Sequence, residues 1–177
     1  MHVIESAAIK GLEVILDRAN DGGEARELVV RKARVSDAQK IVALIDEYAR
    51  KGMMLPRSYG EVLENIRDFT VIAEGERILG CAALHVIWDD VAEIRSLAIA
   101  QELMGRGHGR RLVQRLLQEA RELGLPQVFT LTYQQEFFAK LGFHVVDKKS
   151  LPHKFWKDCF KCVKFATCDE IAMIRDV

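Results

Sequence analysis

The chain has 177 residues, of which 49% are hydrophobic and 29% are charged, an ordinary composition for a globular protein. Lysine and arginine together number 26, and so do aspartate and glutamate, so the charge gives no reason to expect nucleic acid or a membrane surface as a partner. The four cysteines come without an export signal or a long apolar run, and we therefore expect reduced thiols and a cytoplasmic protein.

The N-terminal part of the chain shows a helical pattern followed by an extended one. Residues 4–19 have an amphipathic helical pattern that ends at an Asn-Asp-Gly-Gly breaker. We expect this helix to belong to an N-terminal extension over 1–26, and it is a candidate for contact with a second copy in a homodimer. A strand is predicted over 27–33, at the start of a single domain over 27–177.

Two capping boxes predict the starts of the next two helices. In each box a serine is followed three residues later by glutamine or glutamate, Ser36 with Gln39 and Ser58 with Glu61. We expect the first helix to begin at its box and to end near Gly52.

The rest of the chain alternates between strands and helices. Three strands are predicted in succession, over 69–75, 77–88 and 89–100, and a tight turn joins the first two. A long helix follows, with an apolar stripe at Leu112, Val113, Leu116, Leu117, Ala120 and Leu123 and an end at Gly124 and Pro126. The remaining predicted elements are a strand over 127–133, a helix over 134–142, a strand over 143–148 and a strand near the C-terminus. This order predicts an α+β fold, an antiparallel meander followed by a β-α-β crossover.

Three alternating glycines lie directly before the long helix. Each of Gly105, Gly107 and Gly109 costs about 0.5–1 kcal/mol relative to alanine, so a need for bare backbone is indicated. A strand, a glycine-rich turn and a helix start together leave N–H groups unpaired at the positive end of a helix dipole, which suits a phosphate. Arg106 and Arg110 add charge suited to a diphosphate. The spacing is neither the dinucleotide fingerprint nor a P-loop, and a flexible turn with a solvated basic face stays an alternative.

The stretch from Ile94 to Gly124 resembles the acetyl-CoA motif of the GNAT N-acetyltransferase superfamily, in which Gln/Arg-x-x-Gly-x-Gly/Ala follows a splayed strand. Gly107 and Gly109 match this motif, whereas Met104 stands where the family has Gln or Arg. The segment Phe-Phe-Ala-Lys-Leu-Gly-Phe resembles the superfamily's second motif. The resemblance implies a GNAT fold with a mostly antiparallel sheet, and acetyl-CoA as co-substrate without a metal. The cofactor-binding residues that it implies are Leu97, Ala98, Ile99, Met104, Gly105, Arg106, Gly107, His108, Gly109, Arg110 and Phe138.

A narrower stretch is similar to the acetyltransferase domain of N-acetylglutamate synthases, which act at the head of arginine biosynthesis. The matching residues are the Leu55, Arg57 and Ser58 loop, the Cys-Ala-Ala-Leu segment over 81–84, and Glu93. Long forms of that enzyme carry an amino-acid kinase domain in front. Because the first strand is expected at residue 27, we expect a short form without that domain. The implied substrate is L-glutamate, a small molecule.

The resemblance also implies catalytic roles. Glu93 would act as the base that takes a proton from the substrate ammonium through water, although an ion pair with Arg95 on the same strand face is the alternative. Backbone N–H groups near Leu97 would stabilise the oxyanion. Many superfamily members protonate the leaving thiolate with a tyrosine, but Phe138 occupies that position here, and Tyr133 is the substitute.

Two cations are candidates for the carboxylates of glutamate. Arg57 matches the family's substrate loop, and Lys164 in the C-terminal part is a second candidate, the alternative being a solvated lysine. A zinc site is an alternative use of the same region, with ligands from His153, Cys159, Cys162 and Cys168. We predict no metal, because a second Cys-x-x-Cys pair is missing.

Two further functions stay open at this stage. One is acetylation of another small amine or of a protein N-terminus. The other is a sensor module that binds acetyl-CoA without turnover. Cys81, in an apolar strand, is expected to be a core residue rather than a nucleophile.

Overall fold

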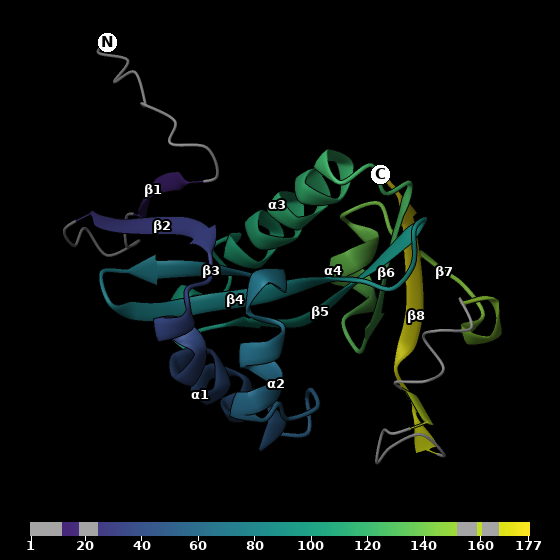
Figure 1. Cartoon of the computed structure of the whole chain (residues 1–177), viewed down its shortest axis with the longest axis horizontal. Helices are drawn as coiled ribbons and strands as arrows, with labels where there is room; N and C mark the ends of the chain where they lie inside the picture. Colours follow the sequence, from purple (N-terminus) through teal and green to yellow (C-terminus); the bar gives the residue numbers. More distant parts are fainter. Residues whose placement is uncertain (1–11, 18–24, 152–158, 161–166) are drawn as a thin grey trace, which may run out of the picture.

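The computed structural model describes residues 12–17, 25–151, 159–160 and 167–177. Within these residues lies one sheet in the order β1-β2-β3-β4-β5-β6-β8-β7, in which every neighbouring pair is antiparallel except β5 and β6 (Figure 1). The strands are β1 (Glu13–Asp17), β2 (Arg26–Lys32), β3 (Phe69–Glu74), β4 (Arg77–Val86), β5 (Val91–Ile99), β6 (Gln127–Thr132), β7 (His144–Val145) and β8 (Ile171–Asp176). The helices are α1 (Ala38–Ala49), α2 (Tyr59–Glu64), α3 (His108–Glu122) and α4 (Gln135–Ala139). The predicted meander and β-α-β crossover are confirmed.

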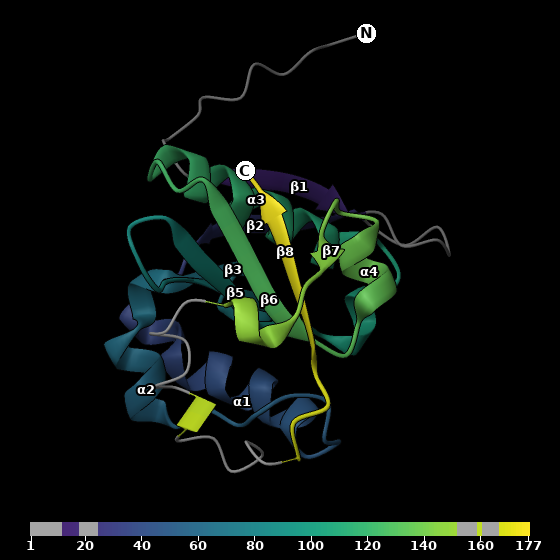
Figure 2. The same cartoon turned by 90° about the vertical axis from the view of Figure 1, so that its right-hand side faces the viewer.

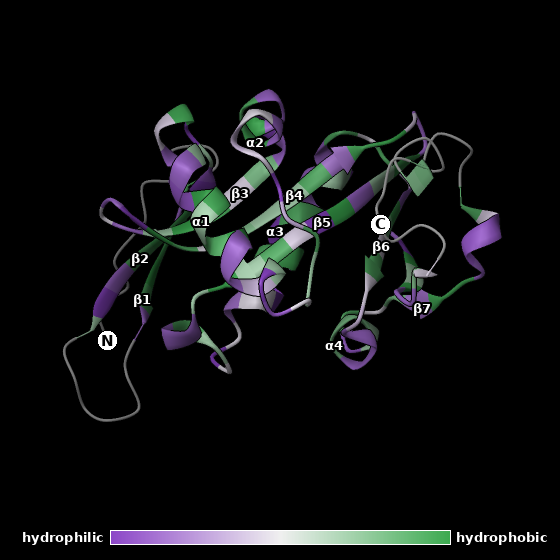
Figure 3. Cartoon of the chain, turned by 90° about the horizontal axis from the view of Figure 1, so that it is seen from below, coloured by the Kyte–Doolittle hydropathy of each residue, from purple (hydrophilic) through white to green (hydrophobic). Residues whose placement is uncertain are grey.

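Helices cover both faces of the sheet. α3 lies on one face, and α1 and α2 lie on the other, as Figures 1 and 2 show from two directions. Successive residues of β3 therefore enter different cores: Val71 and Ala73 pack with α1, whereas Ile72 packs with α3. A strand that is buried on both faces is expected to be apolar throughout, and Figure 3 shows hydrophobic residues concentrated along β3 and β4.

α3 is the helix that the sequence predicts best. Its apolar stripe is buried from Leu112 to Ala120, whereas Leu123, expected in the same stripe, lies past the helix end and is exposed. Gly124 follows with a φ of 76°, a conformation that glycine adopts without strain and that commonly ends helices. Among the described residues, no helix is both long and apolar enough to cross a bilayer.

The helix expected over 4–19 is wrong where the structure can be compared with it. Residues Glu13–Asp17 form β1, an edge strand that pairs antiparallel with β2, and the rest of that range lies largely outside the described residues. The alternation explains the strand, since Ile15 is buried under α3 while Val14 and Leu16 are exposed. Residues 13–17 are therefore part of the central sheet.

The first capping box is also wrong. α1 begins at Ala38 after a 3₁₀ turn, and the carboxylate of Asp37, rather than the hydroxyl of Ser36, accepts the nearby backbone N–H. Its Oδ2 lies 2.7 Å from the backbone nitrogen of Arg34 and 2.6 Å from a guanidinium nitrogen of Arg31. This ion pair ties the start of α1 to β2, which local spacing alone does not indicate.

The second box gives a stability prediction. The Ser58 hydroxyl accepts the N–H of Glu61 at 3.2 Å, and the Glu61 carboxylate accepts the N–H of Ser58 at 2.7 Å. We expect Ser58→Ala to lower the free energy of unfolding by about 1 kcal/mol, measured by denaturant titration. Ser36→Ala is the matched control and should leave it unchanged, because Ser36 is exposed and caps no helix. Equal losses in the two variants would contradict this account.

Candidate active site

β5 and β6 separate after a short parallel stretch. Their register runs from Val91↔Gln127 to Glu93↔Phe129 and goes no further. β5 continues to Ile99 while pairing with β4 on its other side. Among the described residues, no strand pairs with β5 on this side beyond Glu93, so a space opens between β5 and β6.

A pocket of about 1120 Å³ occupies this space. Its walls come from the loop before α2, α2 itself, the second half of β5, the loop before α3, the end of β6, and α4. Sites for small molecules usually measure about 300–1,000 Å³, so the pocket has room for a long cofactor and a small substrate together. The residues that sequence analysis placed at the site and that line the pocket are Arg57, Glu93, Leu97, Ile99, Met104, Gly105, Gly107, His108, Gly109, Arg110, Tyr133 and Phe138.

A β-bulge redirects the edge of β5 where the strands separate. Ser96 and Leu97 together face Ala82, since the register moves from Ala83↔Arg95 to Cys81↔Ala98. Ser96 has a φ of 56°, a left-handed conformation that costs a residue with a side chain roughly 1–2 kcal/mol. Bulges of this kind often lie next to active sites, where they re-aim side chains.

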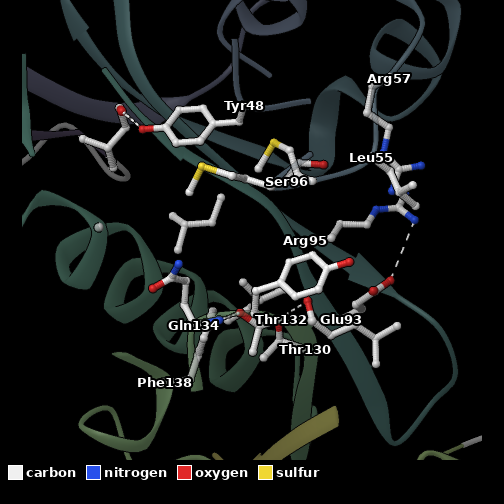
Figure 4. Close-up of a pocket in the computed structure, with 18 of the residues that line it drawn as sticks. Tyr48, Leu55, Arg57, Glu93, Arg95, Ser96, Thr130, Thr132, Gln134 and Phe138 are labelled. Carbon is white, nitrogen blue, oxygen red and sulfur yellow. Dashed lines mark hydrogen bonds and ion pairs between the residues drawn. The ribbon is translucent and has the colours of Figure 1, made fainter. Parts of the chain in front are cut away.

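The three residues after the bulge do not all reach the pocket. Leu97 and Ile99 line it, whereas Ala98, also expected to bind the cofactor, is buried in the core beneath α1. The carbonyl of Ile99 accepts a hydrogen bond from the hydroxyl of Tyr48, at the end of α1 (Figure 4). Tyr48 thus fixes the end of β5, a role that sequence analysis did not foresee.

The loop before α3 presents bare backbone to the pocket. Gly105 and Gly107 have φ values of 74° and 83°, and Gly107 precedes α3 without any side-chain cap. The first backbone bond of the helix is the N–H of Arg111 to the carbonyl of Gly107, so the earlier N–H groups have no partner within the helix. These groups, at the positive end of the helix dipole, form a cradle for an anion.

The arginines of this loop divide into two roles. Arg110 is exposed at the pocket. Arg106, expected at the diphosphate, is not among the residues that line the pocket, and its guanidinium donates to Asp17 of β1 at 2.7 Å. The ring of His108 is buried and also contacts Asp17, at 3.2 Å. Positive charge at the cradle therefore comes from Arg110 and from the backbone.

Two arginine–glutamate pairs lie in another part of the pocket. Arg95 is 3.9 Å from the carboxylate of Glu93, and Arg57 is 3.7 Å from that of Glu61. Hydrogen bonds from Ser58, and then the charges of Arg57 and Arg95, hold the pKa of Glu61 below its usual value. Both guanidinium groups therefore act on one carboxylate, and Figure 4 shows Arg57, Arg95 and Glu93 around the same part of the pocket. Glu93 therefore both pairs with Arg95 and lines the pocket, so the two interpretations of this residue are compatible.

Sequence analysis missed His85 as a site residue. It lines the pocket, and in the ladder of β4 and β5 it lies directly opposite Glu93. Its Nδ1 is 2.6 Å from the carboxylate of Asp68, which fixes the ring. The available signal was a polar side chain directly after the apolar run from Ile78 to Leu84. Arg95 was recognised as a partner for Glu93 but not as a pocket cation.

Tyr133 lines the pocket, and a carboxylate holds its hydroxyl group. Its hydroxyl donates to the carboxylate of Asp169 at 2.8 Å, and this hydrogen bond, with burial, raises the pKa of Tyr133 to about 12. A thiol has a pKa of about 8.5, so proton transfer from Tyr133 to a leaving thiolate would run uphill. The contact instead ties the end of β6 to the segment before β8.

Phe138 packs within α4 and its surroundings. Its ring meets those of Phe137 and Phe143 edge to face, with centroids 5.1 and 5.3 Å away. Phe137 in turn lies close to Gly109, where an added Cβ would be 3.5 Å from the ring. α4 therefore approaches the first turn of α3 at its glycine.

The cysteines give no support for a nucleophile or a metal in the described part of the chain. Cys81 is fully buried, and burial raises the pKa of its thiol to about 12, as expected of a core residue. No group of three or more His, Cys, Asp or Glu side chains in the described ranges is arranged to hold a metal ion. His153, Cys162 and Lys164 lie outside these ranges.

Comparisons with known proteins match this geometry. A model of the acetyltransferase (GNAT) family matches residues 38–143. An uncharacterized N-acetyltransferase of Chlorobaculum tepidum is 40% identical, over 85% of this chain and 97% of its own length. An amino-acid acetyltransferase of Mycobacterium tuberculosis is 42% identical, over 67% of this chain and 70% of its own length. The crystal structure of N-acetylglutamate synthase from Neisseria gonorrhoeae, complexed with coenzyme A and N-acetyl-glutamate, aligns with a TM-score of 0.77 and 28% identity, over 84% of this chain and 35% of that one.

A substitution at Gly107 tests whether the anion cradle binds coenzyme A. Gly107→Glu adds bulk and negative charge at the cradle, and we expect it to weaken coenzyme A binding at least tenfold, measured by calorimetry. Gly75→Glu is the matched control, because Gly75 also has a positive φ and open space around it but lies in the β3–β4 turn, away from the pocket. Coenzyme A binding of normal strength in the Gly107 variant would overturn the assignment of the cradle.

Proposed function

The chain belongs to the acetyltransferase (GNAT) family, and we propose that within it the protein transfers the acetyl group of acetyl-CoA to the amino group of L-glutamate. The product would be N-acetyl-L-glutamate, the intermediate at the head of arginine biosynthesis. The observation that carries the choice of substrate is the pair Arg57 and Arg95, two guanidinium groups in one part of the pocket beside Glu93. The similarity to an amino-acid acetyltransferase and to an N-acetylglutamate synthase supports the same choice.

The dimensions of β5 suit a cofactor with a long arm. Glu93 lies near the start of the strand, and the loop with the anion cradle follows its end at Ile99. Six residues of extended chain span about 20 Å. A diphosphate at the cradle would therefore leave an extended arm running along the free edge of β5 toward Glu93. The bare backbone at Gly107 and the exposed Arg110 fit such a group.

The chain's own groups supply the steps that the reaction needs. Acetyl-CoA, when bound, supplies an activated acyl thioester. Backbone N–H groups on the free edge of β5 hold and polarise its carbonyl. Glu93 takes the proton from the substrate ammonium through a water molecule, which frees the amine to attack. Because a thiol has a pKa of about 8.5, the thiolate leaves without an acid from the protein, and the second proton, which the attacking nitrogen loses as the amide forms, passes to the thiolate or to water.

Substrate recognition requires cations that match two carboxylates. Guanidinium groups bind carboxylates through two parallel hydrogen bonds, which an ammonium group cannot do. Arg57 and Arg95 both line the pocket in which Glu93 lies. We therefore assign one substrate carboxylate to Arg57 and the other to Arg95.

The role of Glu93 gives one prediction. Glu93→Gln keeps the size of the side chain but removes its basicity, so we expect kcat to fall by roughly 10²–10⁴, with coenzyme A binding unchanged. Glu64→Gln, which neutralises an exposed carboxylate at the same pocket, is the control and should keep normal kcat. A Glu93→Gln enzyme with the pH–rate profile of the wild type would show that another group takes the proton.

The role of Arg57 gives the test of the substrate. Arg57→Ala leaves a substrate carboxylate unpaired, and we expect the KM for glutamate to rise about 10- to 150-fold, because such contacts contribute roughly 1.5–3 kcal/mol. The KM for acetyl-CoA should stay the same, and Arg57→Lys should restore part of the loss. Arg50→Ala is the control, because Arg50 is an exposed arginine directly after α1 and does not line the pocket.

Glutamine as substrate separates the two carboxylates of glutamate. If Arg57 holds the γ-carboxylate, Arg57→Ala should raise the KM for glutamine by a smaller factor than the KM for glutamate. If Arg57 holds the α-carboxylate, Arg57→Ala should raise the KM for both substrates by the same factor. Wild-type glutamate kinetics in Arg57→Ala would remove the basis for this substrate and favour another amine.

A further inference from the structure

One carboxylate of the N-terminal strand holds both side chains that flank the central glycine of the cradle. Asp17 accepts a hydrogen bond from Arg106 at 2.7 Å and contacts Nε2 of His108 at 3.2 Å, and these two residues lie on either side of Gly107. Burial alone would raise the pKa of Asp17, but the hydrogen bonds from Arg106 and His108 outweigh it and hold the pKa below its usual value. The ionised carboxylate only accepts, so Nε2 of His108 carries the hydrogen.

The loop itself has little to fix its conformation. Gly105 and Gly107 lie in the left-handed region, where glycine has a wide choice of conformations, and no side chain caps α3. Just before the loop, Glu102 is held by Arg26 of β2 at 2.8 Å and by Arg77 of β4 at 3.1 Å. The contacts of Glu102 therefore anchor the loop before Gly105. Asp17 anchors it at the two residues that flank Gly107.

We infer that Asp17 is a positioning residue for the diphosphate of acetyl-CoA: it orders the backbone N–H groups of the cradle by holding Arg106 and His108. The inference rests on the proposed location of the diphosphate at this loop. Arg106 then contributes to cofactor binding through Asp17, from outside the pocket.

Because Asp17 is negatively charged, the direction in which its neutralisation changes the affinity for the cofactor distinguishes two explanations. A carboxylate close to an anion site repels the anion, so if charge alone mattered, its neutralisation would strengthen cofactor binding. If Asp17 orders the loop, its loss must weaken binding, because the N–H groups are then no longer preorganised. The two accounts predict opposite changes.

The experiment compares two neutralised carboxylates of the same strand. Asp17→Asn should raise the Kd of coenzyme A, measured by calorimetry, roughly tenfold, while kcat at saturating acetyl-CoA and the KM for glutamate stay near wild type. Glu13→Gln is the matched control: it removes the same charge from β1, where Glu13 contacts Arg111 at 2.6 Å in an exposed pair, and its Kd should not rise. Acetyl-pantetheine lacks the diphosphate, and its KM should be the same in Asp17→Asn and wild type.

A double-mutant cycle with Arg106→Met tests the connection directly. If Arg106 acts through Asp17, each single variant should weaken coenzyme A binding, and the double variant should bind no more weakly than Asp17→Asn alone. Additive losses would show that Arg106 contacts the cofactor itself and would overturn the inference. Arg106 is partly exposed, so its variant also serves where Asp17→Asn does not fold.

Other outcomes separate this inference from the function on which it rests. Unchanged or tighter coenzyme A binding in Asp17→Asn, or an equal loss in Glu13→Gln, overturns the inference. An equal loss with acetyl-pantetheine also overturns it, since the effect would then not concern the diphosphate. If Gly107→Glu abolishes coenzyme A binding while Asp17→Asn binds normally, the cradle stands and only the role of Asp17 fails.

Discussion

β5 and β6 pair only from Val91↔Gln127 to Glu93↔Phe129 in the described sheet, and their separation beyond this point is the constraint on which the rest of the site depends. Backbone N–H and C=O groups in a protein interior are costly unless they are paired. The free edge of β5 avoids that cost by facing a pocket, and the bulge at Ser96 sets its direction. Tyr48 pairs with the carbonyl of Ile99 at the far end. The pocket beside this edge suits a ligand that brings its own hydrogen-bond acceptors.

The pocket uses two kinds of electrostatics in its two parts. At the loop before α3, the attraction comes mainly from backbone N–H groups, and Arg106 is directed away to Asp17. A dispersed set of donors suits a diphosphate, whose charge is spread over several oxygens. Beside Glu93, by contrast, the charges belong to the side chains of Arg57 and Arg95, whose forked donors distinguish a carboxylate from other anions. In the function that we propose, the first part holds the cofactor and the second selects the substrate.

Features decided within a few residues could be predicted from the sequence. The stripe of α3, the Ser58 cap and the glycine loop are of this kind, because helix periodicity, capping and turn geometry are local. The start of α1 directly after Asp37 and the direction of Arg106 depend on partners in the sheet, and Arg106 and Asp17 are 89 residues apart. His85 was missed for the same reason, since its position opposite Glu93 follows from the register of β4 and β5.

The position of β8 has a consequence for the order in which the protein is built. β8 follows the other described strands in the sequence, yet it lies between β6 and β7, and β7 has no other partner among these strands. Pairing over such a distance in sequence is slow, because loop closure precedes any gain in contacts. On the ribosome, the wall of the pocket that contains β6 and α4 therefore stays incomplete until β8 has emerged from the exit tunnel, although the β2–β5 meander can already form. Until then the edge of β6 that pairs with β8 stays unpaired in the nascent chain.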